Sequence, residues 1–228
     1  MKTQVLVAAA GKGTRLKARS PKPLIVINNK PLLVYSLEVF EKCSLVDSVI
    51  VVAPKDSLKS FEKIIKNFHS KKKICCVAGG KRRCDSVARG LKRLDKDTQL
   101  VVVHDGARPF LTVKLLKECI WAAQKNRAAI AGVPVKPTVK RVHPRSLKVQ
   151  QTLKRDELWE IQTPQVFDKD ILLKAYKHLA AHTPTDDAQL VECLGVKPKI
   201  VHGSYKNIKI TTREDLALAQ FLLAKGWL

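Results

Sequence analysis

Short apolar runs alternate with amphipathic segments along the first 135 residues of this chain. The apolar runs are rich in β-branched residues and have the length of buried strands, and the segments between them repeat their apolar positions with helical spacing. Strands are expected at residues 5–9, 49–53, 74–77, 100–104 and 128–135, and helices at residues 32–42, 58–69, 86–94 and 113–126. This order predicts an α/β, Rossmann-like fold, in which a mostly parallel sheet carries helices on both faces and ligands bind at the carboxyl ends of the strands.

The pattern changes after Val135. Residues 138–143 and 147–153 alternate polar and apolar positions on either side of a Pro-Arg-Ser turn, which predicts a β-hairpin that protrudes from the body. This hairpin has too few apolar residues to bury a face of its own, and isolated hairpins are marginally stable in water. We therefore predict that residues 136–157 form an arm that packs on a second copy of the chain and makes a homodimer; a mobile surface loop is the alternative.

The rest of the chain returns to the α/β pattern. Helices are expected at residues 168–181, 187–194 and 213–223, and strands at residues 199–202 and 208–211. No linker or internal repeat interrupts the sequence, and 228 residues are enough for one sizeable core. We predict a single domain over residues 1–228.

Composition narrows the class of protein. With 45% hydrophobic residues the chain is unlike disordered proteins, and no run approaches the roughly 20 apolar residues of a transmembrane helix. The apolar segment at residues 5–9 fits a buried strand better than a signal peptide. The six cysteines form no C-x-x-C pair, which favours reduced thiols over a disulfide framework or a metal site. Together these features predict a cytoplasmic protein without a membrane partner.

The formal net charge of +23 leaves two kinds of partner open. A nucleic acid would be bound through neutralisation of its phosphates, whereas a small polyanionic substrate would need cations gathered in a cleft. The basic residues are spread along the chain, and aromatic residues make up only 5%, too few for a base-stacking surface. A small polyanion is therefore the more expected partner, and a solvated, lysine-rich surface accounts for the remaining charge.

A glycine-containing run, A-A-A-G-K-G-T-R at residues 8–15, follows the first expected strand. Small residues at this place let backbone amides approach phosphate oxygens. The run is not a dinucleotide-binding fingerprint, because Leu16 stands where a third glycine is needed, and it lacks the spacing of a P-loop. Arg15 and Lys22 add two cations beside these amides, which favours a phosphate-binding site.

Two further motifs follow or end expected strands. In the run G-G-K-R-R-C-D-S-V at residues 79–87, the glycines allow a ligand close to the backbone, and Arg83 offers a guanidinium to oxyanions. Ser86 can bond a base, and either Ser86 or Asp85 can cap the following helix. In the run H-D-G-A-R-P at residues 104–109, Asp105 is a candidate Mg²⁺ ligand, with a structural ion pair to Arg108 as the alternative. His104 is expected to be a packing residue.

These three motifs, with four more, resemble those of the polyol phosphate cytidylyltransferases, which join CTP to a polyol phosphate. The further motifs are R-x-x-L-W at residues 155–159, Q-T-P-Q-x-F at 162–167, T-D-D-A at 185–188 and N-I-K-I-T at 207–211. Their order and spacing are most similar to those of members that act on 2-C-methyl-D-erythritol 4-phosphate, and the expected arm falls where this family has its dimerising arm. Members that act on ribitol 5-phosphate are the nearest alternative, and a basic nucleic-acid-binding module is a weaker one from another class.

The resemblance implies a role for each matching position. In this family one loop wraps the triphosphate, a lysine reaches the α-phosphate, a second loop holds the cytidine, and further residues bind the metal and the acceptor. The corresponding residues are Ala10, Gly11, Gly13 and Arg15 for the triphosphate, Lys22 for the α-phosphate, Gly80, Arg83 and Ser86 for the cytidine, Asp105 for the metal and substrate, Arg108 for the acceptor phosphate, Thr138 and Arg155 for the acceptor of the neighbouring subunit, and Thr163, Thr185 and Lys209 for the remainder of the site. The expected catalytic residues are Arg15, Lys22 and Lys209, and the expected cofactor is Mg²⁺ or another divalent cation. Pro23 departs from the family, which has a glutamine there.

The implied reaction explains why cations dominate these motifs. The acceptor is a phosphate monoester with a second pKa of about 6, so one of its oxygens can attack the α-phosphorus of CTP without a general base. The protein must then offset the repulsion between the monoester and the triphosphate, which fixed Lys and Arg side chains and Mg²⁺ can do. The expected products are 4-diphosphocytidyl-2-C-methyl-D-erythritol and pyrophosphate.

Overall fold

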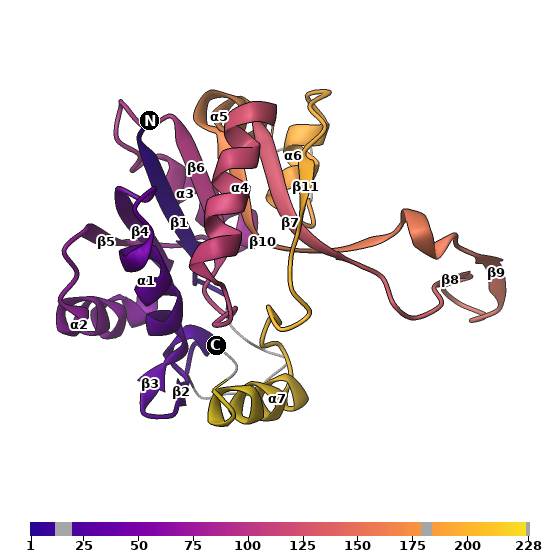
Figure 1. Cartoon of the computed structure of the whole chain (residues 1–228), viewed down its shortest axis with the longest axis horizontal. Coiled ribbons are helices and arrows are strands. Elements are labelled where there is room, and N and C mark those ends of the chain that lie inside the picture. Colours follow the sequence, from indigo (N-terminus) through magenta and orange to yellow (C-terminus); the bar gives the residue numbers. More distant parts are fainter. Residues whose placement is uncertain (12–19, 179–183, 227–228) are drawn as a thin grey trace.

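The computed structural model of the chain describes residues 1–11, 20–178 and 184–226 and has a central sheet between two layers of helices (Figure 1). The seven strands lie in the order β11-β7-β10-β6-β1-β4-β5. Strand β10 runs antiparallel to both of its neighbours, and the other strands run parallel to one another. The strands are β1 (Thr3–Ala8), β4 (Ser48–Ala53), β5 (Lys73–Ala78), β6 (Leu100–Asp105), β7 (Ala128–Pro134), β10 (Trp159–Asp168) and β11 (Lys199–His202). The predicted α/β fold with a mostly parallel sheet is confirmed.

Both faces of the sheet are apolar, which is why both are covered. Successive side chains of a strand point to opposite faces, so Val5 and Val7 of β1 belong to one core and Leu6 to the other. The helices of the first core are α1 (Leu32–Lys42), α2 (Leu58–Phe68) and α4 (Val113–Asn126), and those of the second are α3 (Arg83–Leu91), α5 (Lys169–Lys177) and α6 (Asp187–Glu192). The central strands are therefore near-continuous apolar runs, as expected for a doubly covered sheet.

A third and smaller core lies at one end of the sheet. It joins the short hairpin β2 (Val26–Ile27) and β3 (Lys30–Pro31) to the C-terminal helix α7 (Arg213–Ala224) through buried residues that include Phe110 and Ile210. The sequence pattern did not predict this two-stranded hairpin. The core fixes the segments before and after it, which carry Lys22 and Lys209, to the body of the protein.

Two predictions about single elements were wrong. No strand was expected at residues 159–168, where β10 lies, because Pro164 interrupts the apolar pattern. The register of β10 against β7 shifts between Ile161 and Gln165, so Pro164 lies at an irregularity in the pairing of these strands. The strand expected at residues 208–211 is an extended segment outside any sheet, bonded through the Ile210 amide to the Ala107 carbonyl at 2.9 Å. The helix expected at residues 86–94 begins earlier, at Arg83. The last residues of the helix expected at 168–181 lie outside the described residues.

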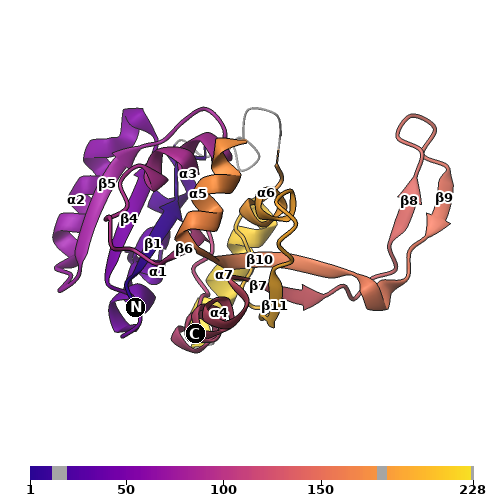
Figure 2. The same ribbon diagram turned by 90° about the horizontal axis from the view of Figure 1, so that it is seen from above.

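The predicted hairpin is present as β8 (Lys140–Val142) and β9 (Val149–Thr152), which pair with each other as a separate two-stranded sheet. All residues of both strands are exposed. The hairpin stands away from the body at the end of two long connections from β7 and β10 (Figure 2). Among the described residues, no helix is both long and apolar enough to span a membrane.

Candidate active site

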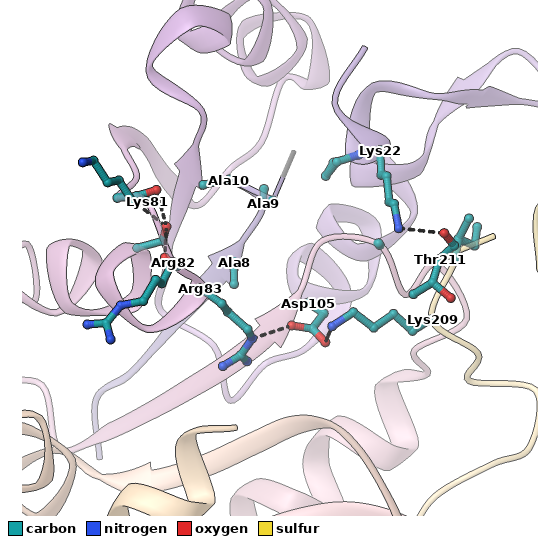
Figure 3. Close-up of a pocket in the computed structure, with 16 residues that line it drawn as sticks. Ala8, Ala9, Ala10, Lys22, Lys81, Arg82, Arg83, Asp105, Lys209 and Thr211 are labelled. Carbon is teal, nitrogen blue, oxygen red and sulfur yellow. Dashed lines mark hydrogen bonds and ion pairs between the residues drawn. The ribbon is translucent and has the colours of Figure 1, made fainter. Parts of the chain in front are cut away.

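A cavity of about 300 Å³ opens at the carboxyl ends of β1 and β6, the edge of the sheet at which ligands were expected (Figure 3). Five segments from the beginning, middle and end of the sequence form its walls. The lining residues are Ala8, Ala9, Ala10, Gly11, Lys22, Pro23, Gly80, Lys81, Arg82, Arg83, Ser86, Asp105, Ala107, Lys209, Ile210 and Thr211. Among these residues five carry a positive charge and one, Asp105, a negative charge, so the cavity suits a polyanion.

Asp105, the last residue of β6, lies at the centre of the positive groups. Its carboxylate pairs with Arg83 Nε at 3.1 Å, Lys209 Nζ at 2.7 Å and Arg108 Nε at 3.7 Å. Burial alone would raise the pKa of Asp105, but the attraction of Arg83, Lys209 and Arg108 outweighs it and holds this pKa well below its usual range. The carboxylate is therefore ionised at any physiological pH. The ion pair between Asp105 and Arg108, which was the alternative to a metal-ligand role, is present.

Arg83 connects Asp105 to a second buried carboxylate. The guanidinium pairs with Asp187 Oδ2 at 2.8 Å, and Asp187, which is fully buried, also accepts a hydrogen bond from Tyr176 Oη at 2.5 Å. Burial acts to lower the pKa of Arg83, but Asp187 and Asp105 raise it above its usual value. Arg83 thus presents a fixed positive charge to the cavity. Asp187 was not among the predicted site residues, although it belongs to the T-D-D-A motif, where two acidic residues precede a helix.

The loop from Gly79 to Ser86 is held by hydrogen bonds within itself. Ser86 Oγ, nearly fully buried, accepts a bond from the Gly80 amide at 3.0 Å and donates one to the Arg82 carbonyl at 3.0 Å. A side chain at Gly80 would collide with Asp85, so this position requires glycine. The cavity is lined, as predicted, by Gly80, Arg83 and Ser86. Ser86 lies within the first turns of α3 and does not cap this helix. The capping interaction comes from Asp85, whose carboxylate accepts a hydrogen bond from the Arg82 amide.

Lys22 and Lys209 approach the cavity from the side of the third core (Figure 3). Lys22 Nζ donates a hydrogen bond to the Thr211 carbonyl at 3.1 Å, which ties the two lysine-bearing segments together. Lys209 remains about two-fifths exposed despite its ion pair with Asp105, so its ammonium can reach a ligand in the cavity. The structure therefore brings together two of the three predicted catalytic residues.

His104 and Thr163 support Asp105 from behind the cavity. Thr163 Oγ1 accepts a hydrogen bond from the Asp105 amide at 3.1 Å and lies 3.0 Å from His104 Nδ1. Burial lowers the pKa of His104 to about 4, so the imidazole is neutral at pH 7. His104 is a packing residue, as expected. Thr163 does not line the cavity, and its contacts give it a supporting position in this structure.

Arg108 is held by the segment that leads to Lys209. Its Nη1 donates a hydrogen bond to the Asn207 carbonyl at 2.7 Å, and Asn207, which is fully buried, donates through Nδ2 to the Thr163 carbonyl at 2.9 Å. Burial lowers the pKa of Arg108, with Asp105 acting against this effect. Asn207 was not a predicted site residue, because its role depends on contacts between distant segments.

The remaining predicted residues have different positions relative to the cavity. Thr138 and Arg155 are exposed in the arm, where Arg155 Nη1 donates to the Lys136 carbonyl at 3.0 Å. Thr185 is exposed and bonds to Gln189 through its amide and hydroxyl at 2.7 and 3.2 Å. Ala10 and Gly11 line the cavity, whereas Gly13 and Arg15 lie outside the described residues.

The cavity can be tested for its fit to the Mg²⁺ that the resemblance implies. No group of three or more His, Cys, Asp or Glu side chains in the described parts of the chain could hold a metal ion. Mg²⁺ is commonly bound through one or two carboxylates together with substrate phosphates and water. Asp105 is the acidic residue of the lining. Its carboxylate could supply one ligand to a cation whose other ligands come from a bound phosphate and water.

Comparison with known proteins identifies the family. The model of the family 2-C-methyl-D-erythritol 4-phosphate cytidylyltransferase, also called IspD, matches residues 3–225. A 2-C-methyl-D-erythritol 4-phosphate cytidylyltransferase from Alkaliphilus oremlandii is 42% identical over 97% of this chain and 95% of its own length, and one from Caldicellulosiruptor bescii is 41% identical over the whole of both chains. The crystal structure of 4-diphosphocytidyl-2C-methyl-D-erythritol synthase from Anaerococcus prevotii superposes with a TM-score of 0.86 at 34% identity, covering 98% of each chain. The chain therefore belongs to the 2-C-methyl-D-erythritol 4-phosphate cytidylyltransferase family.

Proposed function

We propose that this chain transfers CMP from CTP to 2-C-methyl-D-erythritol 4-phosphate, the reaction for which its relatives are named. The observation that carries this proposal is the cavity at the end of β6, where Arg83 and Lys209 pair with the Asp105 carboxylate and Lys22 lines the same cavity. The cations of such a cavity can offset the charges of two polyanions. The acceptor phosphate and the triphosphate are the two polyanions of this reaction.

The reaction needs one bond to form and one to break. An oxygen of the acceptor phosphate forms a bond with the α-phosphorus of CTP, and the bond from that phosphorus to the bridging oxygen of the β-phosphate breaks, so that pyrophosphate leaves. The acceptor is largely dianionic at neutral pH and requires no base, and His104 behind the cavity is buried and neutral. We infer that Lys22 and Lys209 act on the phosphates electrostatically.

The magnitude of the repulsion explains why fixed cations matter. Two unit charges about 4 Å apart repel by about 4 kcal/mol at an effective dielectric constant of about 20. Ammonium and guanidinium groups that already have their positions offset this repulsion without reorganising as the reaction proceeds. Arg83 is fixed by two carboxylates and Lys209 by Asp105, so both satisfy this condition.

We also propose that Mg²⁺ accompanies CTP and that Asp105 would hold it together with the phosphates. When bound, the cation would neutralise phosphate charge and make the α-phosphorus more electrophilic. The six cysteines, all unpaired, support a reducing compartment, and we propose the cytoplasm as the location of the enzyme.

A homodimer formed through the arm completes the proposal. Val142, Leu147 and Val149 are 41, 74 and 61% exposed on the hairpin, and nothing in the described part of the chain covers them. Apolar side chains on an isolated hairpin gain stability when a second copy covers them. In that dimer Thr138 and Arg155 would serve the acceptor in the neighbouring site, as the resemblance implies.

The proposed function is tested by pyrophosphate release. The purified chain is supplied with Mg²⁺, one of the four ribonucleoside triphosphates, and either 2-C-methyl-D-erythritol 4-phosphate or ribitol 5-phosphate. We expect release only when CTP and the methylerythritol phosphate are both present. Equal or faster release with ribitol 5-phosphate, or no release with the methylerythritol phosphate, contradicts the proposal.

A further inference from the structure

Tyr205 lies where the arm leaves the body, in the segment that connects β11 to α7. Its hydroxyl donates a hydrogen bond of 2.6 Å to the carbonyl of Pro134, the last residue of β7. The ammonium of Lys136, at the start of the arm, lies 3.6 Å from the centre of the Tyr205 ring, within the range of a cation–π contact. Tyr205 is 44% exposed, so burial of an apolar ring does not account for its position.

The same segment reaches the active site two residues later. The Asn207 carbonyl accepts the hydrogen bond from Arg108, and Asn207 Nδ2 donates to the Thr163 carbonyl. Lys209 follows and pairs with Asp105. The segment that carries Tyr205 thus also carries the groups that hold Arg108 and Asp105.

Gln162 of β10 fixes the segment between these two ends. Its Nε2 donates a hydrogen bond of 2.8 Å to the Ser204 carbonyl, and its Oε1 accepts one of 3.2 Å from Asn207 Nδ2. The residues on either side of Tyr205 and Lys206 are thus bound to the sheet. The segment from Ser204 to Asn207, called the bracket below, is hydrogen-bonded at both ends and has the root of the arm on one side and Arg108 on the other.

We propose that Tyr205 is a positioning residue, which sets the direction of the arm relative to the bracket that holds Arg108. The inference rests on the proposed function, in which Arg108 binds the acceptor phosphate and the arm reaches the acceptor of the neighbouring subunit. Tyr205 contacts Pro134 and Lys136 at the root of the arm. Through these two contacts it keeps the position of the arm fixed relative to the bracket.

This role is specific for the acceptor. The loop that contains Gly80 and Ser86 is held by its own hydrogen bonds, and Lys22 is bonded to the Thr211 carbonyl. The hydrogen bond and the cation–π contact of Tyr205 go to Pro134 and Lys136, on the other side of the bracket. Loss of Tyr205 should therefore change the KM for the acceptor and leave that for CTP nearly unchanged. A residue that contributed only to stability would change neither constant for the fraction of enzyme that remains folded.

The test compares steady-state constants of three variants with those of the wild-type enzyme. Tyr205→Ala removes both contacts, and Tyr205→Phe removes the hydrogen bond to Pro134 but keeps the ring beneath Lys136. Trp121→Ala is the matched control, because Trp121 is a half-exposed aromatic residue on α4. For Tyr205→Ala we expect a KM for 2-C-methyl-D-erythritol 4-phosphate raised about tenfold and a KM for CTP within twofold of wild type. Tyr205→Phe should recover part of the loss, and Trp121→Ala should match wild type in both constants.

The outcomes separate this inference from the proposed function. Wild-type enzyme that releases no pyrophosphate with the methylerythritol phosphate contradicts the proposed function and removes this inference with it. An active wild type whose Tyr205 variants keep an unchanged acceptor KM, or show equal rises in both KM values, overturns only the positioning role. If Tyr205→Ala lacks a cooperative thermal transition, Tyr205→Phe and Lys136→Met decide by the same criterion: a selective rise in acceptor KM supports the inference, and its absence overturns it.

Discussion

Asp105 carries one negative charge among three cations and is itself nearly buried. It is only 6% exposed, and Arg83, Arg108 and Lys209 all lie within 4 Å of its carboxylate. Removing one partner of a buried ionic cluster leaves the other charges without compensation, which is usually worse than removing the whole cluster. The stability of the ligand-free enzyme should therefore depend strongly on this carboxylate.

We predict that Asp105→Asn lowers the free energy of unfolding by about 3–5 kcal/mol at neutral pH, the usual cost of breaking a buried ion pair. Because the pKa of Asp105 is depressed in the folded state, its contribution is complete above the unfolded-state pKa of about 3.9 and is lost as pH falls below it. Urea unfolding at several pH values measures this difference, which should persist at pH 5 and narrow below about pH 4. The control Glu38→Gln, which breaks the half-exposed pair with Lys30, should cost less than about 1 kcal/mol. A cost for Asp105→Asn as small as that of the control contradicts the central position of this charge.

His104 gives the protein a second pH dependence. Burial lowers its folded-state pKa to about 4, whereas an unfolded histidine has a pKa near 6.5. As the pH falls from 6.5 to 4, the unfolded chain binds a proton at this position and the folded chain does not, so folding becomes less favourable. One pKa unit corresponds to about 1.4 kcal/mol, which gives a loss of about 3 kcal/mol over this range.

His104→Gln should therefore remove most of the decline in stability between pH 6.5 and pH 4, because glutamine does not titrate. The measurement is the free energy of unfolding of wild type and variant at intervals of half a pH unit. His178→Gln, at an exposed position, serves as the matched control and should follow the wild-type curve. Parallel curves for wild type and His104→Gln would show that the buried imidazole is not the titrating group.

At the scale of elements, hydrophobic periodicity identified every strand that is buried on both faces and lacks a proline. The helices at Leu32–Lys42 and Val113–Asn126 begin and end where the pattern placed them. Strand β10 escaped detection because Pro164 and several polar residues break its pattern, while its pairing with β6 and β7 involves residues distant in sequence. The segment at 208–211 has a strand-like pattern but finds no neighbouring strand, because it bonds to the loop after β6.

The arm exposes three apolar side chains, those of Val142, Leu147 and Val149, which we propose are covered by a second copy of the chain. We predict that the wild-type chain sediments as a dimer at micromolar concentration and that Val149→Asp shifts it to a monomer, because a carboxylate would be buried where two arms meet. Gln150→Asp adds the same charge at the neighbouring position, which points to the opposite face of the strand, and should leave the dimer intact. A wild-type monomer at these concentrations, or equal effects of the two variants, contradicts dimerisation through this face of the arm.

At the scale of the whole molecule, the active site depends on segments drawn from the beginning, middle and end of the chain. The family resemblance carried by the ordered motifs predicted that Gly11, Lys22, Gly80, Asp105 and Lys209 belong to one site, and all five line the same cavity. The contacts of Arg83 with Asp187 and of Arg108 with Asn207 could not be predicted, because neither partner is close in sequence and both contacts form only when the sheet is assembled. Sequence motifs therefore identify the groups that touch ligands more readily than the groups that hold them in place.

The central claim is that cations in fixed positions around two anions provide most of the catalysis. Lys209 tests this claim because its ammonium lies 2.7 Å from Asp105 and remains partly open to the cavity. Its replacement by methionine keeps an unbranched side chain, one atom shorter, and removes the charge. Lys199→Met, at an exposed position on β11, is the matched control.

The most direct measurement is the kcat for pyrophosphate release by Lys209→Met at saturating CTP and 2-C-methyl-D-erythritol 4-phosphate. We predict a kcat at least 100-fold below that of wild type, equivalent to about 2.7 kcal/mol of lost transition-state stabilisation, with Lys199→Met unchanged. A kcat within twofold of wild type for Lys209→Met would contradict the account.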